Sequence, residues 1–254
     1  MHNYQAPADL LKDRIILVTG AGGAIGGTAA KTFAAHGATV ILLGRTQGKL
    51  EATYDAIEQS GHPQAVLCPL DLQTATPQDY QTVAEGIQQQ FGRLDGLLHA
   101  AAMLGTLTPL EHYDLGLWSR VMQVNLNAPF MLTQACLGLL KQSGDASVIF
   151  TAADVGHKGR AYWGAYGVAH AAVENLAEIL ADELETNTAI RINSLDPGPV
   201  RSRLRALAYP GEDPNTLPPP ESVMAGFLYL MGPDSTGITG QRLSMQDKLP
   251  NPAS

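Results

Sequence analysis

The sequence has few of the features that mark a secreted, membrane-spanning or nucleic-acid-binding protein. Its 254 residues carry 16 basic against 24 acidic side chains, for a formal net charge of −8. No apolar run approaches the roughly 18 residues of a spanning helix, and the first residues lack the charged-then-apolar pattern of a secretory signal. An acidic chain without a basic cluster has little attraction for phosphate backbones or anionic lipid. We therefore expect a cytoplasmic protein that binds neither nucleic acid nor membranes.

Cysteine is also scarce. Cys68 and Cys136 are the only two, and they have neither CxxC spacing nor a neighbouring group of histidines. Such residues are typical of buried free thiols in a reducing compartment. A disulfide and a metal site are the alternatives, and we expect no metal.

Short β-branched or leucine-rich runs alternate with longer segments whose apolar residues recur near a 3.6-residue spacing. The runs predict strands buried on both faces, at residues 14–19, 38–43, 65–68, 94–99, 146–150 and 189–193. The segments between them predict helices, at residues 24–36, 47–60, 77–91, 111–141 and 163–185. This alternation is typical of a parallel sheet with helices on both faces. We predict one α/β domain over residues 1–254.

One segment breaks the pattern. Residues 209–220 contain five prolines, too short a stretch to link two domains. It predicts an excursion over the sheet edge, either a lid over a substrate site or a plain surface loop.

A glycine-rich turn follows the first predicted strand. Residues 19–27 read TGAGGAIGG and run directly into a helix. Glycines there allow a tight turn and let a pyrophosphate approach backbone N–H groups at the helix N-terminus, where the helix dipole favours negative charge. A plain turn is the alternative, but the strand and helix around it favour a dinucleotide site.

The second predicted strand ends at Gly44 and Arg45. A dinucleotide fold presents this position to the adenosine ribose, where an acidic side chain would bind the 2′-OH of NAD. A glycine followed by an arginine instead leaves room and positive charge for the 2′-phosphate of NADP. We predict NADP(H) over NAD(H), with an ordinary solvated arginine as the alternative.

Several motifs, in this order, resemble the short-chain dehydrogenase/reductase family over about residues 11–245. They are the glycine turn, LDL at 70–72, MQVNLN at 122–127, a tyrosine on a helix at Tyr166, and DPG at 196–198. Within the family the sequence is most similar to the bacterial YciK-type oxidoreductases, through residues 9–20, 159–166 and 230–235. The resemblance implies a Rossmann-type doubly wound fold of about seven parallel strands and hydride transfer between a nicotinamide cofactor and a carbonyl or alcohol.

The resemblance also implies site residues. Tyr166 matches the proton donor, and Asn125 matches the residue that anchors a proton-relay water. Positions that match the family's cofactor-binding residues are Gly20, Ala24, Ile25, Gly26, Arg45, Asp71, Leu72, Ala100, Pro197 and Gly198, with Ser202 in the segment that closes over the nicotinamide.

The catalytic set departs from the family pattern at two positions. The lysine expected four residues after the tyrosine is His170, which is shorter and has no fixed positive charge at pH 7. The serine expected thirteen residues before the tyrosine is Ala153, whose methyl group cannot donate a hydrogen bond. Each loss typically costs about 10²-fold or more in rate. We therefore expect weakened turnover.

The cofactor site departs from the pattern as well. Residues 100–102 are three alanines where the family has Asn-Ala-Gly, and Ala24 replaces the middle glycine of the turn. An alanine would be strained at a positive φ and accepted at a negative one.

Other residues could take over the missing roles. Asp154, His157 and His170 lie near Tyr166 in the sequence, so a rewired acid/base set is conceivable. The alternatives are a cap residue for Asp154, a solvated loop side chain for His157 and a neutral, space-filling side chain for His170. Tyr162 and Trp163 are expected near the substrate mouth, at an oligomer surface or in the core.

Three functional hypotheses remain. The first is an NADP(H)-dependent oxidoreductase acting on a small carbonyl or alcohol, with Tyr166 and His170 at its centre. The second is a pseudoenzyme that senses nucleotide or pairs with an active subunit, and the third is a cofactor-free, non-redox enzyme of the same fold. The helices at 111–141 and 163–185 resemble those at family interfaces, so we expect a homo-oligomer, a dimer or a tetramer.

Overall fold

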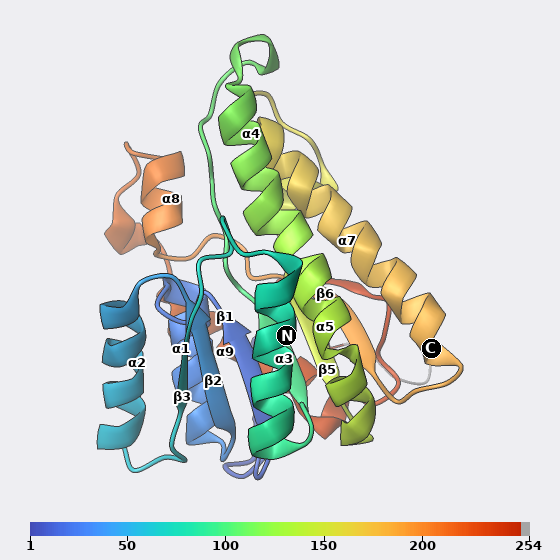
Figure 1. Ribbon diagram of the computed structural model, residues 1–254. Coiled ribbons are helices and arrows are strands. Elements are labelled where there is room, and N and C mark those ends of the chain that lie inside the picture. The colour runs from blue at the N-terminus through green and yellow to red at the C-terminus, as the bar shows by residue number, and fades with distance from the viewer. Residues whose placement is uncertain (250–254) are drawn as a thin grey trace.

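The computed structural model describes residues 1–249 and shows a single parallel sheet between two layers of helices (Figure 1). Its order is β3-β2-β1-β4-β5-β6-β7, and every neighbouring pair is parallel. The strands are β1 (Ile15–Thr19), β2 (Thr39–Gly44), β3 (Val66–Pro69), β4 (Gly96–His99), β5 (Ser147–Thr151), β6 (Arg191–Asp196) and β7 (Arg242–Ser244). The predicted Rossmann-type fold with seven parallel strands is confirmed.

Helices cover both faces of the sheet, which explains why the strand residues of β1 are all buried. One face packs on α1 (Ala24–Ala35), α2 (Gln47–Gln59) and α9 (Met224–Met231). The other packs on α3 (Pro77–Phe91), α5 (Ala128–Ser143) and α7 (Gly164–Glu185). Each face therefore has its own hydrophobic core, and the sheet separates the two.

The helix predicted at 111–141 has a different start and is interrupted. A 3₁₀ turn at Leu110–His112 precedes α4 (Leu115–Met122), whose N-terminus is capped by Asp114 accepting a hydrogen bond from the Leu117 N–H at 2.6 Å. A π-helical turn, Gln123–Asn127, then joins α4 to α5. A periodicity of 3.6 cannot reveal such a turn, because it adds one residue without ending the helix.

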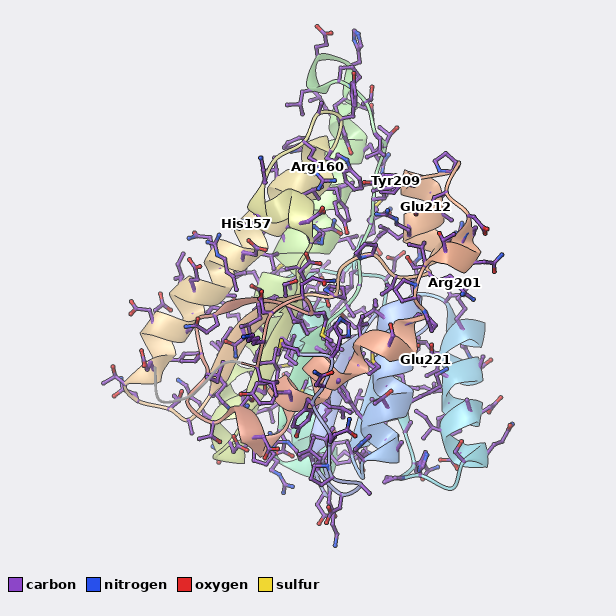
Figure 2. The ribbon with its side chains drawn as sticks, turned by 180° about the vertical axis from the view of Figure 1, so that it is seen from behind. His157, Arg160, Arg201, Tyr209, Glu212 and Glu221 are labelled. Atoms are coloured by element: carbon purple, nitrogen blue, oxygen red, sulfur yellow. The ribbon has the colours of Figure 1, made fainter. Side chains whose placement is uncertain are left out.

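The proline-rich segment 209–220 follows α8 (Arg203–Ala208) and includes the 3₁₀ turn Pro214–Thr216. Two arginines tie it to the chain before it. Arg201 donates to the carbonyls of Pro214 at 3.0 Å and Leu217 at 3.4 Å, and Arg205 forms two hydrogen bonds to Glu212 at 2.6 and 2.7 Å. Figure 2 labels Arg201 and Glu212 in this part of the molecule. The segment and α8 thus form one unit beside the carboxyl ends of the strands.

Cys68 and Cys136 are both free thiols, the first partly buried and the second buried. Among residues 1–249, no group of three or more histidine, cysteine or acidic side chains has a geometry that could hold a metal ion. Within the same range, no helix has the length and apolarity needed to cross a bilayer.

Candidate active site

A cavity of about 800 Å³ opens at the carboxyl ends of the strands, where the sheet order reverses between β1 and β4. Ligands of open α/β sheets bind at this switch point. Most of the residues predicted for the site line the cavity: Gly20, Ala24, Ile25, Arg45, Asp71, Leu72, Ala100, Asn125, Tyr166, His170, Pro197, Gly198 and Ser202. Gly26 does not line it and has a packing role instead.

The glycine turn has the backbone geometry of a phosphate cradle. Gly20 adopts φ +66°, and a Cβ there would lie 2.8 Å from the Ala101 backbone, so a larger residue is excluded. A Cβ on Gly26 would overlap the Gly20 carbonyl group. No side chain caps α1, so the first N–H groups of the helix are left to a ligand or to water.

Ala24 fits this turn without strain. Among the described residues, Asp13 and Tyr162 are the only non-glycine residues with positive φ. Ala24 is the first residue of α1, a position with negative φ that accepts a Cβ. The substitution of the middle glycine therefore leaves the cradle intact.

Basic side chains gather at the end of the cavity next to β2. Arg45 and Lys49 both line it, together with Thr46. Both basic residues are exposed, and within residues 1–249 neither side chain has a hydrogen-bond or ion-pair partner. Asp71 on the opposite side accepts a hydrogen bond from the Gln73 N–H at 3.0 Å. Lys49 and Thr46 were not predicted, although their place at the start of the helix after β2 could have indicated them.

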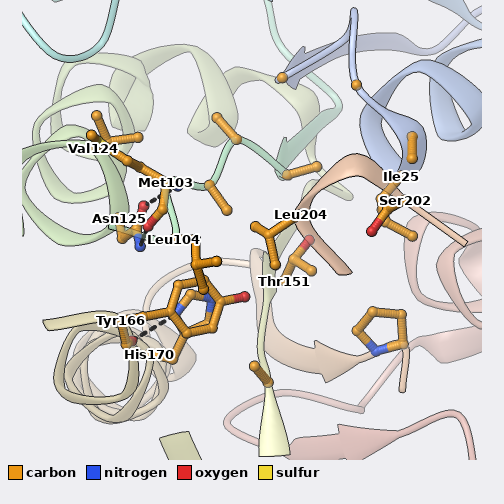
Figure 3. Close-up of a pocket in the computed structure, with 18 of the residues that line it drawn as sticks. Ile25, Met103, Leu104, Val124, Asn125, Thr151, Tyr166, His170, Ser202 and Leu204 are labelled. Carbon is orange, nitrogen blue, oxygen red and sulfur yellow. Dashed lines mark hydrogen bonds between the residues drawn. The ribbon is translucent and has the colours of Figure 1, made fainter. Parts of the chain in front are cut away.

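The loop after β4 forms the cavity wall between the two halves of the sheet. The Thr19 hydroxyl accepts hydrogen bonds from the N–H groups of Ala100 at 3.0 Å and Ala101 at 3.2 Å. Asn125, in the π-helical turn, accepts from the Met103 N–H at 2.8 Å and donates to the Met103 carbonyl at 2.9 Å (Figure 3). The Asn125 amide therefore positions this loop with both of its polar atoms.

Tyr166 and His170 are stacked on each other. Both are buried on α7, one helical turn apart, and their ring centroids lie 4.1 Å apart with the planes at 29°. The His170 Nδ1 lies 3.0 Å from the Tyr166 carbonyl oxygen, which can only accept, so this nitrogen carries a proton. In Figure 3 the Tyr166 hydroxyl points into the cavity, on the side of Leu204 and Thr151.

Burial keeps both rings neutral. It lowers the pKa of His170 to about 4, with a smaller opposing effect from the hydrogen bond to the Tyr166 carbonyl. Burial also raises the pKa of Tyr166 above its ordinary value of 10.0, and the carboxylates of Asp196 and Asp154 raise it further. At neutral pH the site therefore holds a protonated phenol beside an uncharged imidazole, with no cation to stabilise a tyrosinate.

The position expected to hold a serine contributes only the methyl group of Ala153 to the cavity. Two residues earlier, Thr151 at the end of β5 also lines the cavity, and its buried Oγ1 has no hydrogen-bond partner. An unpaired buried hydroxyl costs roughly 1–3 kcal/mol. Nothing in the sequence marked Thr151, because a threonine at a strand end is ordinary in composition.

Only some of the residues that could replace the missing catalytic groups face the cavity. Asp154 lines the cavity but pairs with Arg160 at 2.6 Å. His157 is exposed and lies outside the cavity lining. Tyr162 is exposed as well, whereas Trp163 lines the cavity. The acid/base groups that line the cavity and act on Tyr166 include His170, Asp154 and Asp196.

The segment after β6 closes the remaining side of the cavity. Gly198 adopts φ +71°, and its N–H donates to the Asp196 carboxylate at 2.8 Å. Ser202 caps α8 by accepting from the Arg205 N–H at 3.1 Å. Pro197 and Gly198 therefore turn the chain away from the sheet and direct α8 over the cavity.

A doubly wound sheet, a glycine cradle and a cavity-facing tyrosine on α7 define a nucleotide-binding oxidoreductase fold, and the sequence model of the short chain dehydrogenases matches residues 14–213. The chain belongs to the short chain dehydrogenase family. It is 46% identical over 246 residues to the uncharacterized oxidoreductase YciK of Escherichia coli (strain K12), covering 97% of this chain and 96% of the relative.

Solved structures agree with this assignment. A candidate short chain dehydrogenase from Pseudomonas syringae superposes with a TM-score of 0.94 at 54% identity, over 96% of this chain and 99% of the other. Another from Escherichia coli CFT073, complexed with NADPH, gives 0.90 at 47% identity, over 95% and 100% of the two chains. The family and the YciK-type resemblance are confirmed.

Proposed function

We propose that the protein is an NADPH-dependent carbonyl reductase in which Tyr166 donates the proton. The observation that carries this proposal is the position of the Tyr166 hydroxyl, which faces the same cavity as the glycine cradle of α1. A nucleotide seated on the cradle and a carbonyl at the tyrosine would share one enclosed space.

The residues of the cavity fit an NADP molecule. Gly20 and the uncapped start of α1 would hold the pyrophosphate, and Asp71 and Leu72 would border the adenine. Arg45 and Lys49 supply two unpaired positive charges where the 2′-phosphate would lie, which favours NADP(H) over NAD(H). A related structure that is complexed with NADPH supports this choice.

NADPH, when bound, supplies the hydride for reduction. The substrate carbon accepts it, the π bond of the carbonyl breaks, and the oxygen takes the proton of the Tyr166 hydroxyl. A phenol whose pKa is raised is still more acidic than the aliphatic alcohol that forms, so proton transfer to the alkoxide-like oxygen is favourable. The oxygen lacks a donor from Ala153, and the resulting tyrosinate lacks a cation at His170. Both losses predict slow turnover.

The first test is calorimetric titration with NADPH and, separately, with NADH. We expect NADPH to bind at least about tenfold more tightly than NADH, because a hydrogen bond to a charged phosphate is worth about 1.5–3 kcal/mol. The double variant Arg45→Ala, Lys49→Ala should remove this preference. Oxidation of NADPH by a panel of ketones and aldehydes then tests the reaction. Loss of turnover in Tyr166→Phe with NADPH binding unchanged would support the proton role; turnover unchanged in that variant would refute it.

A second candidate is a nucleotide-binding protein without turnover of its own. Two observations favour it: the methyl group of Ala153 at the oxyanion position, and the uncharged His170 ring stacked on Tyr166. Tight NADPH binding with no oxidation across the panel, by the wild type, would favour this candidate over the reductase.

We also propose that copies of the chain pair through α4, α5 and α7. Large apolar side chains are exposed on these helices: Leu115, Phe130, Val168 and Ile179. Burying them between subunits would remove apolar surface from water. Light scattering tests this proposal, and a monomer mass would contradict it.

A further inference from the structure

Apolar side chains surround the part of the cavity next to the Tyr166 hydroxyl. They come from the loop after β4, from the start of α7 and its approach, and from α8 and the residue after it. Together they form one cluster around the tyrosine. Besides Tyr166 and Ala153, six members of the cluster line the cavity, and we name them the apolar chamber: Leu104, Val155, Trp163, Leu204, Ala208 and Tyr209.

Aromatic rings form one wall of the chamber. Trp163 lies between Tyr166 and Tyr209, with ring centroids 5.6 Å and 5.9 Å away and the planes tilted by 56° and 44°. Offset and tilted contacts of this kind are the favourable ones for aromatic pairs. The wall therefore presents flat apolar surface beside the reacting hydroxyl.

The charged groups at this end of the cavity are mostly neutralised by one another. Arg205 is held by both oxygens of Glu212, at 2.6 and 2.7 Å, and lies 3.7 Å over the Tyr209 ring. Asp154 pairs with Arg160 at 2.6 Å. Asp196 and Arg203 also line the cavity, and among the described residues neither has an ion-pair partner, although Asp196 accepts a hydrogen bond from the Gly198 N–H at 2.8 Å. The unpaired Arg203 makes a carboxylate on the substrate the competing possibility, whereas the Asp196 carboxylate disfavours it.

We propose that the substrate is an uncharged ketone or aldehyde that carries an apolar ring, with the ring in the apolar chamber and the carbonyl at Tyr166. This inference rests on the proposed reductase function and adds the class of substrate. Burying a ring against the chamber removes apolar area from water. A hydroxylated or ionised substrate would instead lose its water and regain few hydrogen bonds, because among the chamber side chains only the Trp163 N–H and the Tyr209 hydroxyl can form them.

The test compares three probes for binding to the full protein saturated with NADP⁺. Acetophenone carries a ring and no charge, phenylglyoxylate carries the same ring with a carboxylate, and dihydroxyacetone is small and polar. Calorimetry should give a dissociation constant for acetophenone at least about tenfold lower than for either of the others. Binding is measured apart from turnover, so slow chemistry does not hide the result.

Variants of the chamber sharpen the test. Trp163→Ala should weaken acetophenone binding about tenfold or more and leave NADPH affinity unchanged, which also shows that the variant is folded. Leu204→Ser, at the start of α8, should have a smaller effect in the same direction. Trp118→Phe is the matched control, because Trp118 packs on Tyr113 with centroids 5.7 Å apart and does not line the cavity.

The outcomes separate the two proposals. If phenylglyoxylate binds more tightly than acetophenone, and Arg203→Ala removes that binding, the substrate is an acid and the inference is wrong. If NADPH binds but acetophenone does not, the inference is wrong while the reductase proposal stands. If acetophenone binds as predicted but no ring ketone is reduced, the chamber does bind an apolar ring, but the reductase proposal fails and with it the role of that ligand as a substrate. Absence of NADPH binding removes both.

Discussion

Buried polar side chains have different partners at the two ends of the sheet. At the amino ends of β1, β5 and β6, Arg14 and Arg191 both pair with Asp145, at 2.9 and 2.8 Å, although the buried Nε atom of each arginine has no hydrogen-bond partner. At the carboxyl ends, Thr151 holds an unpaired buried hydroxyl, and Tyr166 and His170 hold buried titratable rings without a charged hydrogen-bond partner. The first arrangement lowers the free energy of the fold, whereas the second leaves groups free for a ligand.

This difference indicates which end of the sheet holds the functional site. At the amino ends, burial alone would raise the pKa of Asp145, but hydrogen bonds and charges from Arg14 and Arg191 lower it overall. At the carboxyl ends no charged group offsets the burial of Tyr166 and His170, and both pKa values shift toward the neutral forms despite the smaller opposing effect of the hydrogen bond at His170. Uncompensated shifts in a cavity mark a candidate site.

We expect the largest effect on stability from a substitution that removes the ion pairs at the amino ends of the strands. Asp145→Ala leaves the buried guanidinium of Arg191 without its carboxylate, and we expect the free energy of unfolding to fall by about 3 kcal/mol. Denaturant unfolding measures this change. Asp182→Ala, on the exposed side of α7, is the matched control and should be nearly neutral. An equal effect of the two variants would refute the pairing role.

The same pair predicts a pH dependence of stability. The folded pKa of Asp145 is lowered from its ordinary 3.8, so its contribution is present above that value and is lost as pH falls below it. The wild type should therefore lose more stability than Asp145→Ala in this range, and parallel pH profiles would contradict the assignment.

We expect the next largest effect, on the reaction rate, from restoring the two missing catalytic side chains at the carboxyl ends of the strands. Ala153→Ser with His170→Lys restores a donor to the substrate oxygen and a cation beside Tyr166, and we expect NADPH oxidation to rise about 10²-fold. Initial rates with a ring ketone measure this change. The buried lysine should also lower stability, which a melting curve reports. Restored charge without any gain in rate would show that another feature limits turnover.

The pH profile of reduction sharpens the contrast further. Because the Tyr166 pKa lies above its ordinary 10.0, the phenol stays protonated and the reduction rate should be constant from neutral pH to about pH 10. Oxidation of the alcohol requires the tyrosinate and should rise about tenfold per pH unit over this range. A reduction rate that declines near neutral pH would show a second titrating group.

The smallest effect should come from Thr151→Val, which removes an unpaired buried hydroxyl with little change of shape. We expect the free energy of unfolding to rise by about 1 kcal/mol in the protein without ligand. Thr133→Val is the matched control, because the Thr133 hydroxyl lies 2.8 Å from His99 Nε2 in a buried hydrogen bond, and its loss should destabilise the fold. If both variants are destabilised equally, Thr151 has a partner after all.

The fold was largely predictable from the sequence, because buried strands and amphipathic helices leave periodic traces. The glycine turn was predictable for a similar reason, since its residue types follow from local backbone geometry at Gly20. The strand Arg242–Ser244 was not located, because three residues with only partly buried side chains give no clear period. The π-helical turn was missed because helical periodicity continues on both sides of it.

The arrangement of the candidate site was less predictable. A functional and a space-filling His170 could not be distinguished from the residue pattern, since the stacking of His170 on Tyr166 depends on how α7 packs against the sheet. Thr151 lines the cavity through long-range geometry that no local pattern encodes, whereas Lys49 could have been inferred from its place at the start of the helix after β2. The Arg201 and Arg205 contacts that order residues 209–220 likewise depend on where α8 lies.

The π-helical turn at Gln123–Asn127 limits which deletions the chain can accept without losing the site. One inserted residue advances a helix by about 100°, so α4 and α5 present faces that differ in phase by that angle. Deleting a single residue there would restore a regular helix and rotate α4 against α7. Asn125 would move away from Met103, and the cavity wall would keep only its hydrogen bonds to the Thr19 hydroxyl. The length of this turn is therefore as much a determinant of the site as the identity of any side chain in it.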